Sequence, residues 1–162
     1  SEGIFIYGDK AFVARQAKGV SIVDISNTIL PEELGNYETA GSTDAIAVRD
    51  NLAFVAERSN GLRVLDVSDP ANIAKVGFVG TAESPEKLSL FGDYAYLSCS
   101  MEGVRIVDIS DPEDPVLNGI YSGDFDAEEI FVKEDTLYVS NQDGGLLMID
   151  VSDPLHPQEI AS

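Results

Sequence analysis

Apolar and polar residues alternate over short stretches of this chain, as they do in β-strands. The segments KLSLF (Lys87 to Phe91) and RVLDV (Arg63 to Val67) show this period of two. Successive side chains of a strand point to opposite faces, so the period predicts strands that pack on at least one face. No stretch carries the wider spacing that a long helix needs.

Residues 85–126 illustrate the expected order of strands. Strands are predicted at about 86–91, 94–99, 104–110 and 116–121. Tight turns join the first three strands, and an Asp-Pro segment precedes the fourth. Glycine in such turns accepts the positive φ of a hairpin. The segment is therefore expected to form a four-stranded antiparallel meander.

One string recurs along the chain at a fixed interval. GLRVLDVSDP (61–70) returns as GVRIVDISDP (103–112) and GLLMIDVSDP (145–154), and in weaker form as GVSIVDISNT (19–28). The interval is 42 residues each time, because the same aspartate stands at positions 24, 66, 108 and 150. The chain thus divides into four units, at about 1–42, 43–84, 85–126 and 127–162.

These units predict an all-β protein, a β-propeller of four four-stranded antiparallel blades in a single domain, residues 1–162. A sheet of ~40 residues cannot cover both of its faces and is stable only when neighbours pack on it. Repetition of such sheets around an axis is the propeller solution. The ring is expected either to close with four blades or to be half of a larger ring. A linear β-solenoid is the competing fold, although it usually repeats in fewer residues.

The end of the repeated string is interpreted as a turn. Pro70 and its equivalents, Pro112 and Pro154, fix φ and lack an N–H group, so the strand cannot continue past them. The carboxylate of Asp69 is expected to accept hydrogen bonds from the turn. Asp66 lies inside the expected strand and is expected to find its donors in an adjacent loop. A turn is favoured over a metal site for this segment.

Two segments resemble a known family. VRIVDISDPEDPVLNGIYSG and LRVLDVSDPANIAKVGFVG, preceded by GDYAYLS and DNLAFVA, are similar to LVIVD repeats, which occur in bacterial and archaeal proteins, often at the cell surface. The first unit departs from the pattern where NTILPEELG replaces the Asp-Pro turn. The resemblance implies a β-propeller and an exported or cell-surface location. It carries over no catalytic residue.

Composition narrows the function classes. The 162 residues include 29 acidic and 10 basic side chains, for a formal net charge of −19. Such a charge repels nucleic acids and anionic membrane surfaces, and neither is expected as a partner. No apolar run approaches the ~18 residues of a membrane span, so no membrane insertion is expected. The start, SEGIFIYGDK, lacks the layout of a signal peptide.

Residues that commonly carry chemistry are sparse. Cys99 and His156 are the sole cysteine and histidine and lie far apart in the sequence, which leaves too few ligands for a His/Cys zinc site. Cys99 is interpreted as a packed small apolar residue. A non-enzymatic protein without a catalytic residue is therefore expected.

One set of acids recurs at the start of each unit. Its members are Glu2, Asp44, Glu86 and Glu128. The first strand of a propeller blade borders the central channel, so these carboxylates are expected near one end of the axis. Hard cations such as Ca²⁺ take oxygen ligands, and calcium is the one cofactor considered. The alternative function is a metal-assisted hydrolase with water as the nucleophile.

Loops at one end of the predicted ring vary while the scaffold repeats. Loops on a rigid frame often carry binding, so a protein or glycan partner is expected there. The candidate contact residues are Arg15, Gln16, Glu57, Arg58, Met101, Glu102, Asp124, Phe125, Asn141 and Gln142. Phe125 is expected either to anchor a partner or, preferably, to pack under the neighbouring blade. The protein is thus expected to be a binding or scaffold propeller. A homodimer that completes a larger ring is a further expectation.

Overall fold

The computed structural model describes residues 3–123, 125–142 and 144–162, and within them the chain forms four antiparallel sheets of four strands. The first sheet contains β1 (Ile4–Tyr7), β2 (Lys10–Ala14), β3 (Val20–Asp24) and β4 (Glu32–Tyr37). The second contains β5 (Ser42–Arg49), β6 (Leu52–Arg58), β7 (Gly61–Asp66) and β8 (Ala74–Gly80), with the short 3₁₀ helix η1 (Pro70–Asn72) before β8.

The third sheet contains β9 (Lys87–Phe91), β10 (Tyr94–Ser98), β11 (Val104–Asp108) and β12 (Val116–Tyr121). The fourth contains β13 (Ala127–Lys133), β14 (Thr136–Asn141), β15 (Gly145–Asp150) and β16 (Gln158–Ala161). Each sheet is a meander, with its strands paired in chain order. The predicted four-bladed, four-stranded architecture is confirmed. Asp50, Asn51 and Glu134 adopt positive φ in the tight turns after the first strands.

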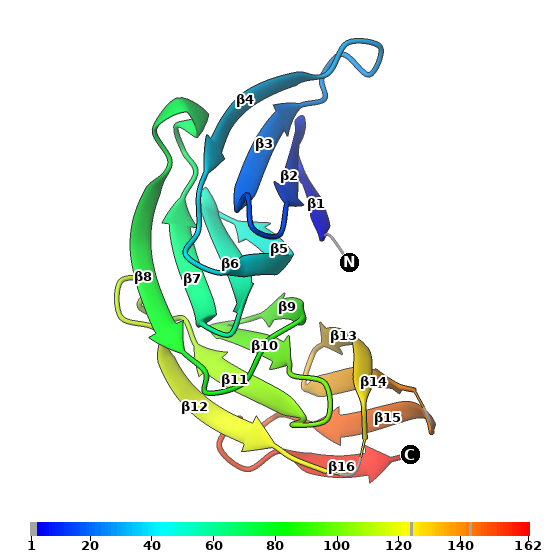
Figure 1. The fold of residues 1–162 in the computed structure, drawn as a ribbon. Coiled ribbons are helices and arrows are strands. Elements are labelled where there is room, and N and C mark those ends of the chain that lie inside the picture. Colours follow the sequence, from blue (N-terminus) through cyan, green and yellow to red (C-terminus); the bar gives the residue numbers. More distant parts are fainter. Residues whose placement is uncertain (1–2, 124, 143) are drawn as a thin grey trace.

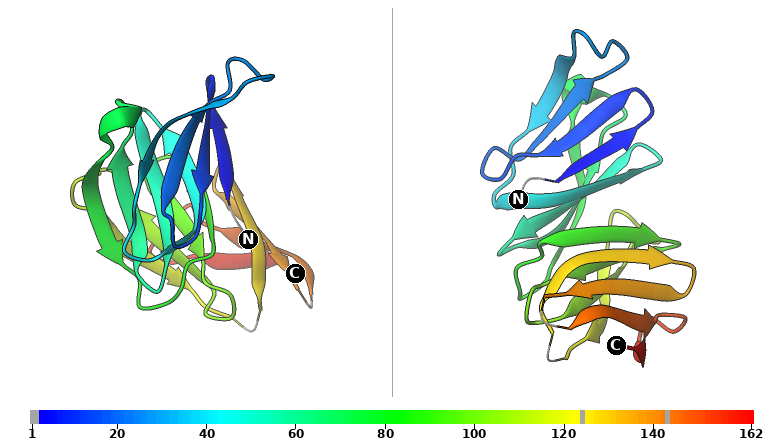
Figure 2. Two further views of the ribbon diagram at one scale, coloured as in Figure 1. Left: turned by 45° about the horizontal axis from the view of Figure 1, so that its top comes forward. Right: turned by 90° about the vertical axis from the view of Figure 1, so that its right-hand side faces the viewer.

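The four sheets follow one another along an arc, with β1, β5, β9 and β13 on its inner side and β4, β8 and β12 on its outer side (Figure 1). Each sheet packs on the next: β1 and β2 on β5, β5 on β9, and β9 and β10 on β13. Among the described residues, no strand of the first sheet packs to this extent on a strand of the fourth. Figure 2 shows the sheets stacked in chain order. In the same part of the chain, no helix has the length and apolar character to cross a bilayer.

The core consists of three apolar clusters, one between each pair of consecutive sheets. In the first cluster, Phe12 and Ile22 of the first sheet meet Val55 and Leu65 of the second. The second cluster joins the second and third sheets, and the third cluster joins the third and fourth. Each sheet except the first and last therefore contributes apolar side chains from both faces, as the repeat requires.

The third strand of each sheet leads into two successive turns closed by side chains. The carboxylate of Asp66 accepts a hydrogen bond from the Ser68 N–H at 2.8 Å, and Asp69 accepts one from the Ala71 N–H at 3.0 Å. The same pair recurs at Asp108 and Asp111 and at Asp150 and Asp153. The expectation for Asp66 is corrected, since its donor lies in its own turn and not in an adjacent loop.

These turns also join neighbouring sheets. A Cβ atom added to Gly77 of β8 would lie 2.1 Å from the carbonyl oxygen of Pro112, which belongs to the next sheet. Gly35 and Gly119 have the same relation to Pro70 and Pro154. Only a residue without a side chain allows this approach. The repeated Asp-Pro turn is thus a docking element, received by the outer strand of the preceding sheet.

We expect Gly77→Ala to destabilise the protein by about 1–3 kcal/mol, because the added methyl forces the second and third sheets apart. Gly80→Ala on the same strand is the matched control, since its added Cβ meets no atom closer than 3.6 Å. Urea unfolding of the three proteins measures the difference. Equal midpoints for the two variants would contradict this account of the contact.

Candidate functional site

One end of the arc collects the variable loops, and we call it the loop face. It comprises the β2–β3, β6–β7, β10–β11 and β14–β15 turns and the connections between consecutive sheets. The loop-face turns of one sheet form backbone hydrogen bonds with the beginning of the next sheet. Gln16 and Thr43 exchange backbone hydrogen bonds of 3.1 Å each, and the Ala127 N–H donates to Ser100 at 3.4 Å. These bonds fix the loops relative to the sheets.

Most of the described candidate contact residues lie on the surface of the loop face. Gln16, Arg58, Met101, Glu102 and Gln142 are exposed. Arg15 and Asn141 are partly buried. Arg15 donates to the Ser21 hydroxyl at 2.6 Å and to Glu33 at 3.3 Å, so its guanidinium lies along the outer part of the first sheet.

Two candidate contact residues are corrected by the structure. Glu57 has no exposed surface, because Arg63 and Asn60 bond its carboxylate. Phe125 is also buried and packs against Tyr121, with 5.7 Å between ring centroids. Neither side chain is available to a partner. Asp124, the neighbouring candidate, lies outside the described residues.

Protein cations already engage two of the recurring acids, of which Asp44 lines a hollow on the inner side of the arc. The Arg58 guanidinium donates to Asp44 at 2.7 Å and lies 3.1 Å from Glu86. Hydrogen bonding to Asp44 raises the pKa of Arg58. Glu128 is exposed on β13, and Glu2 lies outside the described residues. Among residues 3–123, 125–142 and 144–162, no group of three or more potential metal ligands comes together.

A second ion pair lies beneath the loop face, with Arg105 buried and Glu83 partly buried. Arg105 makes a two-pronged contact with Glu83, at 2.8 Å from Nε and 2.7 Å from Nη2, and also donates to the Glu102 carbonyl. The hydrogen bond from Arg105 holds the pKa of the Glu83 carboxyl below its usual value. Planar, paired contacts of this kind fix both side chains in one geometry. Cations of the loop face thus serve to position its connections.

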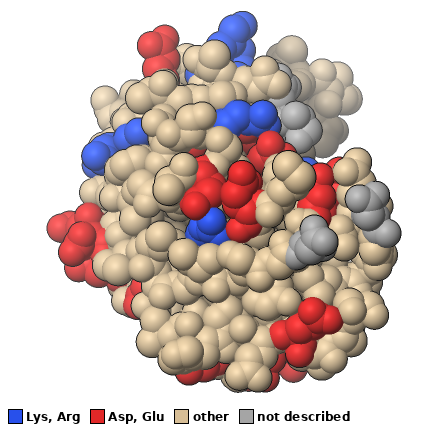
Figure 3. All heavy atoms as spheres, turned by 60° about the horizontal axis from the view of Figure 1, so that its bottom comes forward, with Lys and Arg blue, Asp and Glu red and all other residues tan. Residues whose placement is uncertain are grey.

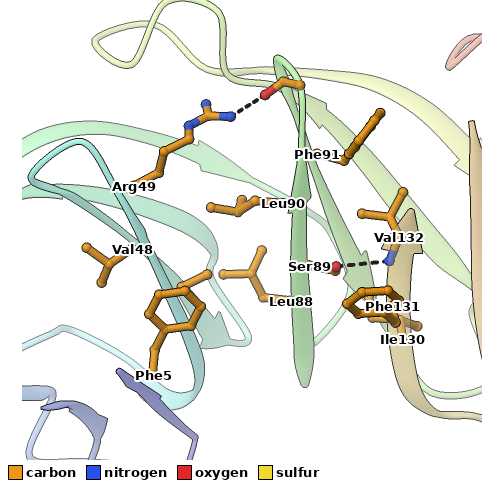
Figure 4. Close-up of a pocket in the computed structure, with 12 residues that line it drawn as sticks. Phe5, Val48, Arg49, Leu88, Ser89, Leu90, Phe91, Ile130, Phe131 and Val132 are labelled. Atoms are coloured by element: carbon orange, nitrogen blue, oxygen red, sulfur yellow. Dashed lines mark hydrogen bonds between the residues drawn. The ribbon is translucent and has the colours of Figure 1, made fainter. Parts of the chain in front are cut away.

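A hollow on the inner side of the arc was not predicted from the sequence. Its volume is about 520 Å³, and strands β5, β9 and β13 supply most of its lining, including Val48, Leu88, Leu90, Phe131 and Val132 (Figure 4). A smaller hollow of about 300 Å³ shares Phe5 and Leu88 with it and includes Asp44, Lys87 and Glu129.

The inner side of the arc is therefore apolar along the larger hollow and charged at the smaller one. Lys87 and Glu129 form an ion pair of 3.1 Å there. On the face of the molecule drawn in Figure 3, acidic side chains likewise gather around fewer basic ones. The apolar residues of IFIY and KLSLF, which supply Phe5, Leu88, Leu90 and Phe91 to the lining, were the signal in the sequence.

Cys99 provides no reactive thiol. It is fully buried, and burial raises the pKa of its thiol to about 12, so the group stays protonated at neutral pH. The thiolate is the nucleophilic form, and a buried neutral thiol is inert. The interpretation of Cys99 as a packed residue agrees with this burial.

The lowered pKa of Glu83 predicts a pH dependence of stability. We expect Glu83→Gln to cost about 1–3 kcal/mol at neutral pH, because Arg105 loses its charged acceptor. A carboxyl with a depressed pKa stabilises the fold above its unfolded-state pKa and loses this effect on acidification. The difference between wild type and variant should therefore shrink as pH falls below 4.5.

Urea unfolding at a series of pH values measures this difference. Glu113→Gln, in the exposed turn before β12, is the control and should leave stability nearly unchanged at every pH. A wild-type to Glu83→Gln difference that stayed constant down to acid pH would show that the ion pair does not carry the effect.

Two solved structures of computationally designed proteins, Ika8 and Ika4, are similar, each with a TM-score of 0.74, at 11% and 10% identity. The match covers 99% of this chain and 48% of Ika8, and 90% of this chain and 88% of Ika4. The chain thus spans about half the length of Ika8. At this identity the likeness concerns the fold alone.

Among proteins with curated functions, no sequence matches significantly. A family model described as LVIVD repeat matches four times, at residues 1–39, 40–81, 84–123 and 125–162. These matches coincide with the four sheets. A propeller of such repeats is in general a binding or scaffold type of protein. The chain belongs to the LVIVD-repeat family.

Proposed function

We propose that this chain is a non-enzymatic binding module whose loop face docks a protein partner through a basic segment of that partner. The observation that carries the proposal is that the sheets repeat and are rigidly bonded, whereas the side chains exposed on the turns differ from one repeat to the next. The β2–β3 and β10–β11 turns are bonded to the next sheet, while Gln16 and Met101 of these turns stay exposed. Arg58 at the end of β6 and Gln142 in the β14–β15 turn are exposed as well. Varied side chains on a rigid frame favour specific recognition at low entropic cost.

Charge supports a basic partner. The chain carries 29 acidic and 10 basic residues. On the loop face, Arg58 and Arg105 are already paired with carboxylates of the chain itself. Lys18 is exposed in the β2–β3 turn, but exposed carboxylates such as Glu102 and the net charge of −19 keep the overall field negative. Complementary charge speeds association and selects partners of opposite sign.

The side chains available on this face favour a protein over a glycan. Met101 is exposed at the tip of the β10–β11 turn. Methionine adapts its shape to irregular apolar partners and is common at protein-binding surfaces. Among the described residues of the loop face, no aromatic ring is exposed, since Phe125 is buried and Tyr37 and Tyr121 are partly buried. The face thus lacks the flat apolar platforms that aromatic side chains supply.

Selection from a random peptide library displayed on phage, against the immobilised chain, tests the proposal. We expect the enriched peptides to be rich in Lys and Arg and to bind less tightly as salt is added. Glu102→Lys on the loop face should weaken a selected peptide about tenfold, whereas Glu113→Lys at the opposite end should change its affinity less than about twofold. Fluorescence anisotropy of the labelled peptide measures both variants.

Several outcomes would overturn the proposal. Enriched peptides without basic residues would show that the partner is not recognised through a basic segment. Equal effects of Glu102→Lys and Glu113→Lys would remove the loop face as the binding surface. Retention of the chain on an array of neutral glycans, with no enriched peptide, would replace the protein partner with a glycan.

We also propose that the module acts outside the cytoplasm, which the family resemblance supports. Protease added to intact cells of the source organism should then degrade the protein while a cytoplasmic marker survives. Immunoblotting before and after treatment measures this loss. Full protection in intact cells, with digestion only after lysis, would contradict the location.

A further inference from the structure

Among the described residues, the first and fourth sheets each leave uncovered a face that is packed on a neighbour in the other sheets. We call the face of a sheet toward the preceding sheet its leading face, and the face toward the following sheet its trailing face. The first sheet has no neighbour on its leading face, which carries Ile4, Ile6 and Val13. The fourth sheet has none on its trailing face, which carries Phe131, Leu146 and Met148.

Side chains at equivalent positions, 42 residues apart or a multiple of it, differ in exposure between these faces and the internal interfaces. On the leading face, Ile4 and Ile6 are 65% and 53% exposed, whereas their equivalents in the second sheet, Ile46 and Val48, are 5% and 4% exposed. On the trailing face, Leu146 is 54% exposed. Its equivalents are fully buried, namely Val20, Leu62 and Val104. Both terminal faces thus keep the apolar character of an interface without its partner.

We propose that two copies of this chain close head to tail into one ring of eight sheets, the trailing face of each fourth sheet packing on the leading face of the other copy's first sheet. The repeat indicates that the partner of each terminal face is a second copy of the chain. Three interfaces within the chain join a trailing face to a leading face. A second copy supplies the same two surfaces in the same order.

The open arc favours closure by a second copy over closure within one chain. The first and fourth sheets do not pack on each other as consecutive sheets do, and Figure 1 shows the gap between them. The chain also superposes with 99% of its length on 48% of Ika8. Two such arcs related by a two-fold axis would satisfy both contacts at once.

One polar contact of the arc has a ready counterpart at the new interface. The Arg49 side chain, at the end of β5, donates to the Gly92 carbonyl of the next sheet. Lys133 stands at the equivalent position of the fourth sheet, two repeats later, and Gly8 stands two repeats before Gly92. In the ring, Lys133 would donate to the carbonyl of Gly8 in the second copy. Gly8 has open space around its Cα, which leaves this approach free.

The outer edge of the new interface must differ from the internal ones. Ala161 occupies the position of the docking glycines, and Thr28 occupies that of the prolines they receive. The same turn of the first sheet presents Ile29 and Leu30, 91% and 75% exposed. Ile160 on β16 is exposed as well. Apolar contact between this turn of one copy and β16 of the other would replace the glycine-to-carbonyl contact. The turn would lie farther from β16 than in the internal interfaces, because Ala161 carries a side chain.

Closure would also complete the channel. Phe131 and Phe5 line the inner hollow and lie near its two open sides, since they belong to β13 and β1. In the ring, Phe131 would face the first strand of the second copy, as Phe5 faces the second sheet within the chain. The wall would then consist of eight first strands, and the ring would present two copies of the loop face on one side.

Size-exclusion chromatography with light scattering tests the proposal. The expected mass is twice the 17.4 kDa of one chain. Because each chain carries a net charge of −19, added salt should strengthen the association. A mass of 17.4 kDa at ~100 μM protein, where a micromolar complex would be formed, would overturn the proposal. A mass that grew continuously with concentration would overturn it too, since it indicates open chains of copies.

Variants of the terminal faces show whether these faces mediate the association. Ile6→Glu on the leading face and Leu146→Glu on the trailing face should each raise the dissociation constant more than about tenfold, because a charge enters the apolar contact. Ile120→Glu, on the outer strand β12, is the control and should leave the dimer intact. Circular dichroism checks that all three variants keep the sheet signal.

A mixture of the Ile6→Glu and Leu146→Glu chains separates this mode from any other dimer. Each variant keeps one unaltered face, so the mixture retains one complete interface and should form a heterodimer that neither variant forms alone. A mixture that stayed monomeric, or a dimer that survived both single variants, would show that the terminal faces do not join two copies.

Discussion

Apolar contact between the faces of consecutive sheets is the interaction on which the rest of the structure depends. A four-stranded sheet of this size has two apolar faces and no stability without neighbours. The interval of 42 residues solves this problem, because it brings equivalent side chains to every interface. Phe12, Phe54 and Tyr96, for example, are buried at the same point of three successive interfaces. The loops keep fixed positions because the sheets beneath them cannot shift independently.

The fold was predictable from the sequence because its determinants are local and repeated four times. Strand period, hairpin glycines and the Asp-Pro turn each act over a few residues, and repetition separates them from chance. The candidate site was less predictable because its contacts join different strands or sheets. Glu57 reads as a loop carboxylate, yet its partner Arg63 lies across the hairpin and buries it. Arg58 likewise lies between Asp44 and Glu86 and pairs with both. The sequence shows that these two acids occupy equivalent positions of consecutive units, but it does not show that a cation lies between them.

The proposed function and the proposed ring involve different surfaces. Recognition would use the ends of the sheets, where charged and flexible side chains are exposed. Closure would use the flat faces of the first and last sheets, where the exposed groups are aliphatic or aromatic. A two-fold ring would therefore repeat the recognition surface without covering it. Two weak contacts with a partner that displays its basic segment twice would then reinforce each other through effective concentration.

The contact between Gly77 and the Pro112 carbonyl, with its two equivalents, has a consequence for how such a chain grows during evolution. Each of these contacts joins a glycine on the outer strand of one repeat to the Asp-Pro turn of the following repeat. A duplicated repeat arrives with both the glycine and the turn and restores both junctions at once, so gain or loss of whole units requires no compensating substitution. Thr28 and Ala161 stand at the equivalent positions of the first and fourth units, where no such contact forms within the described residues.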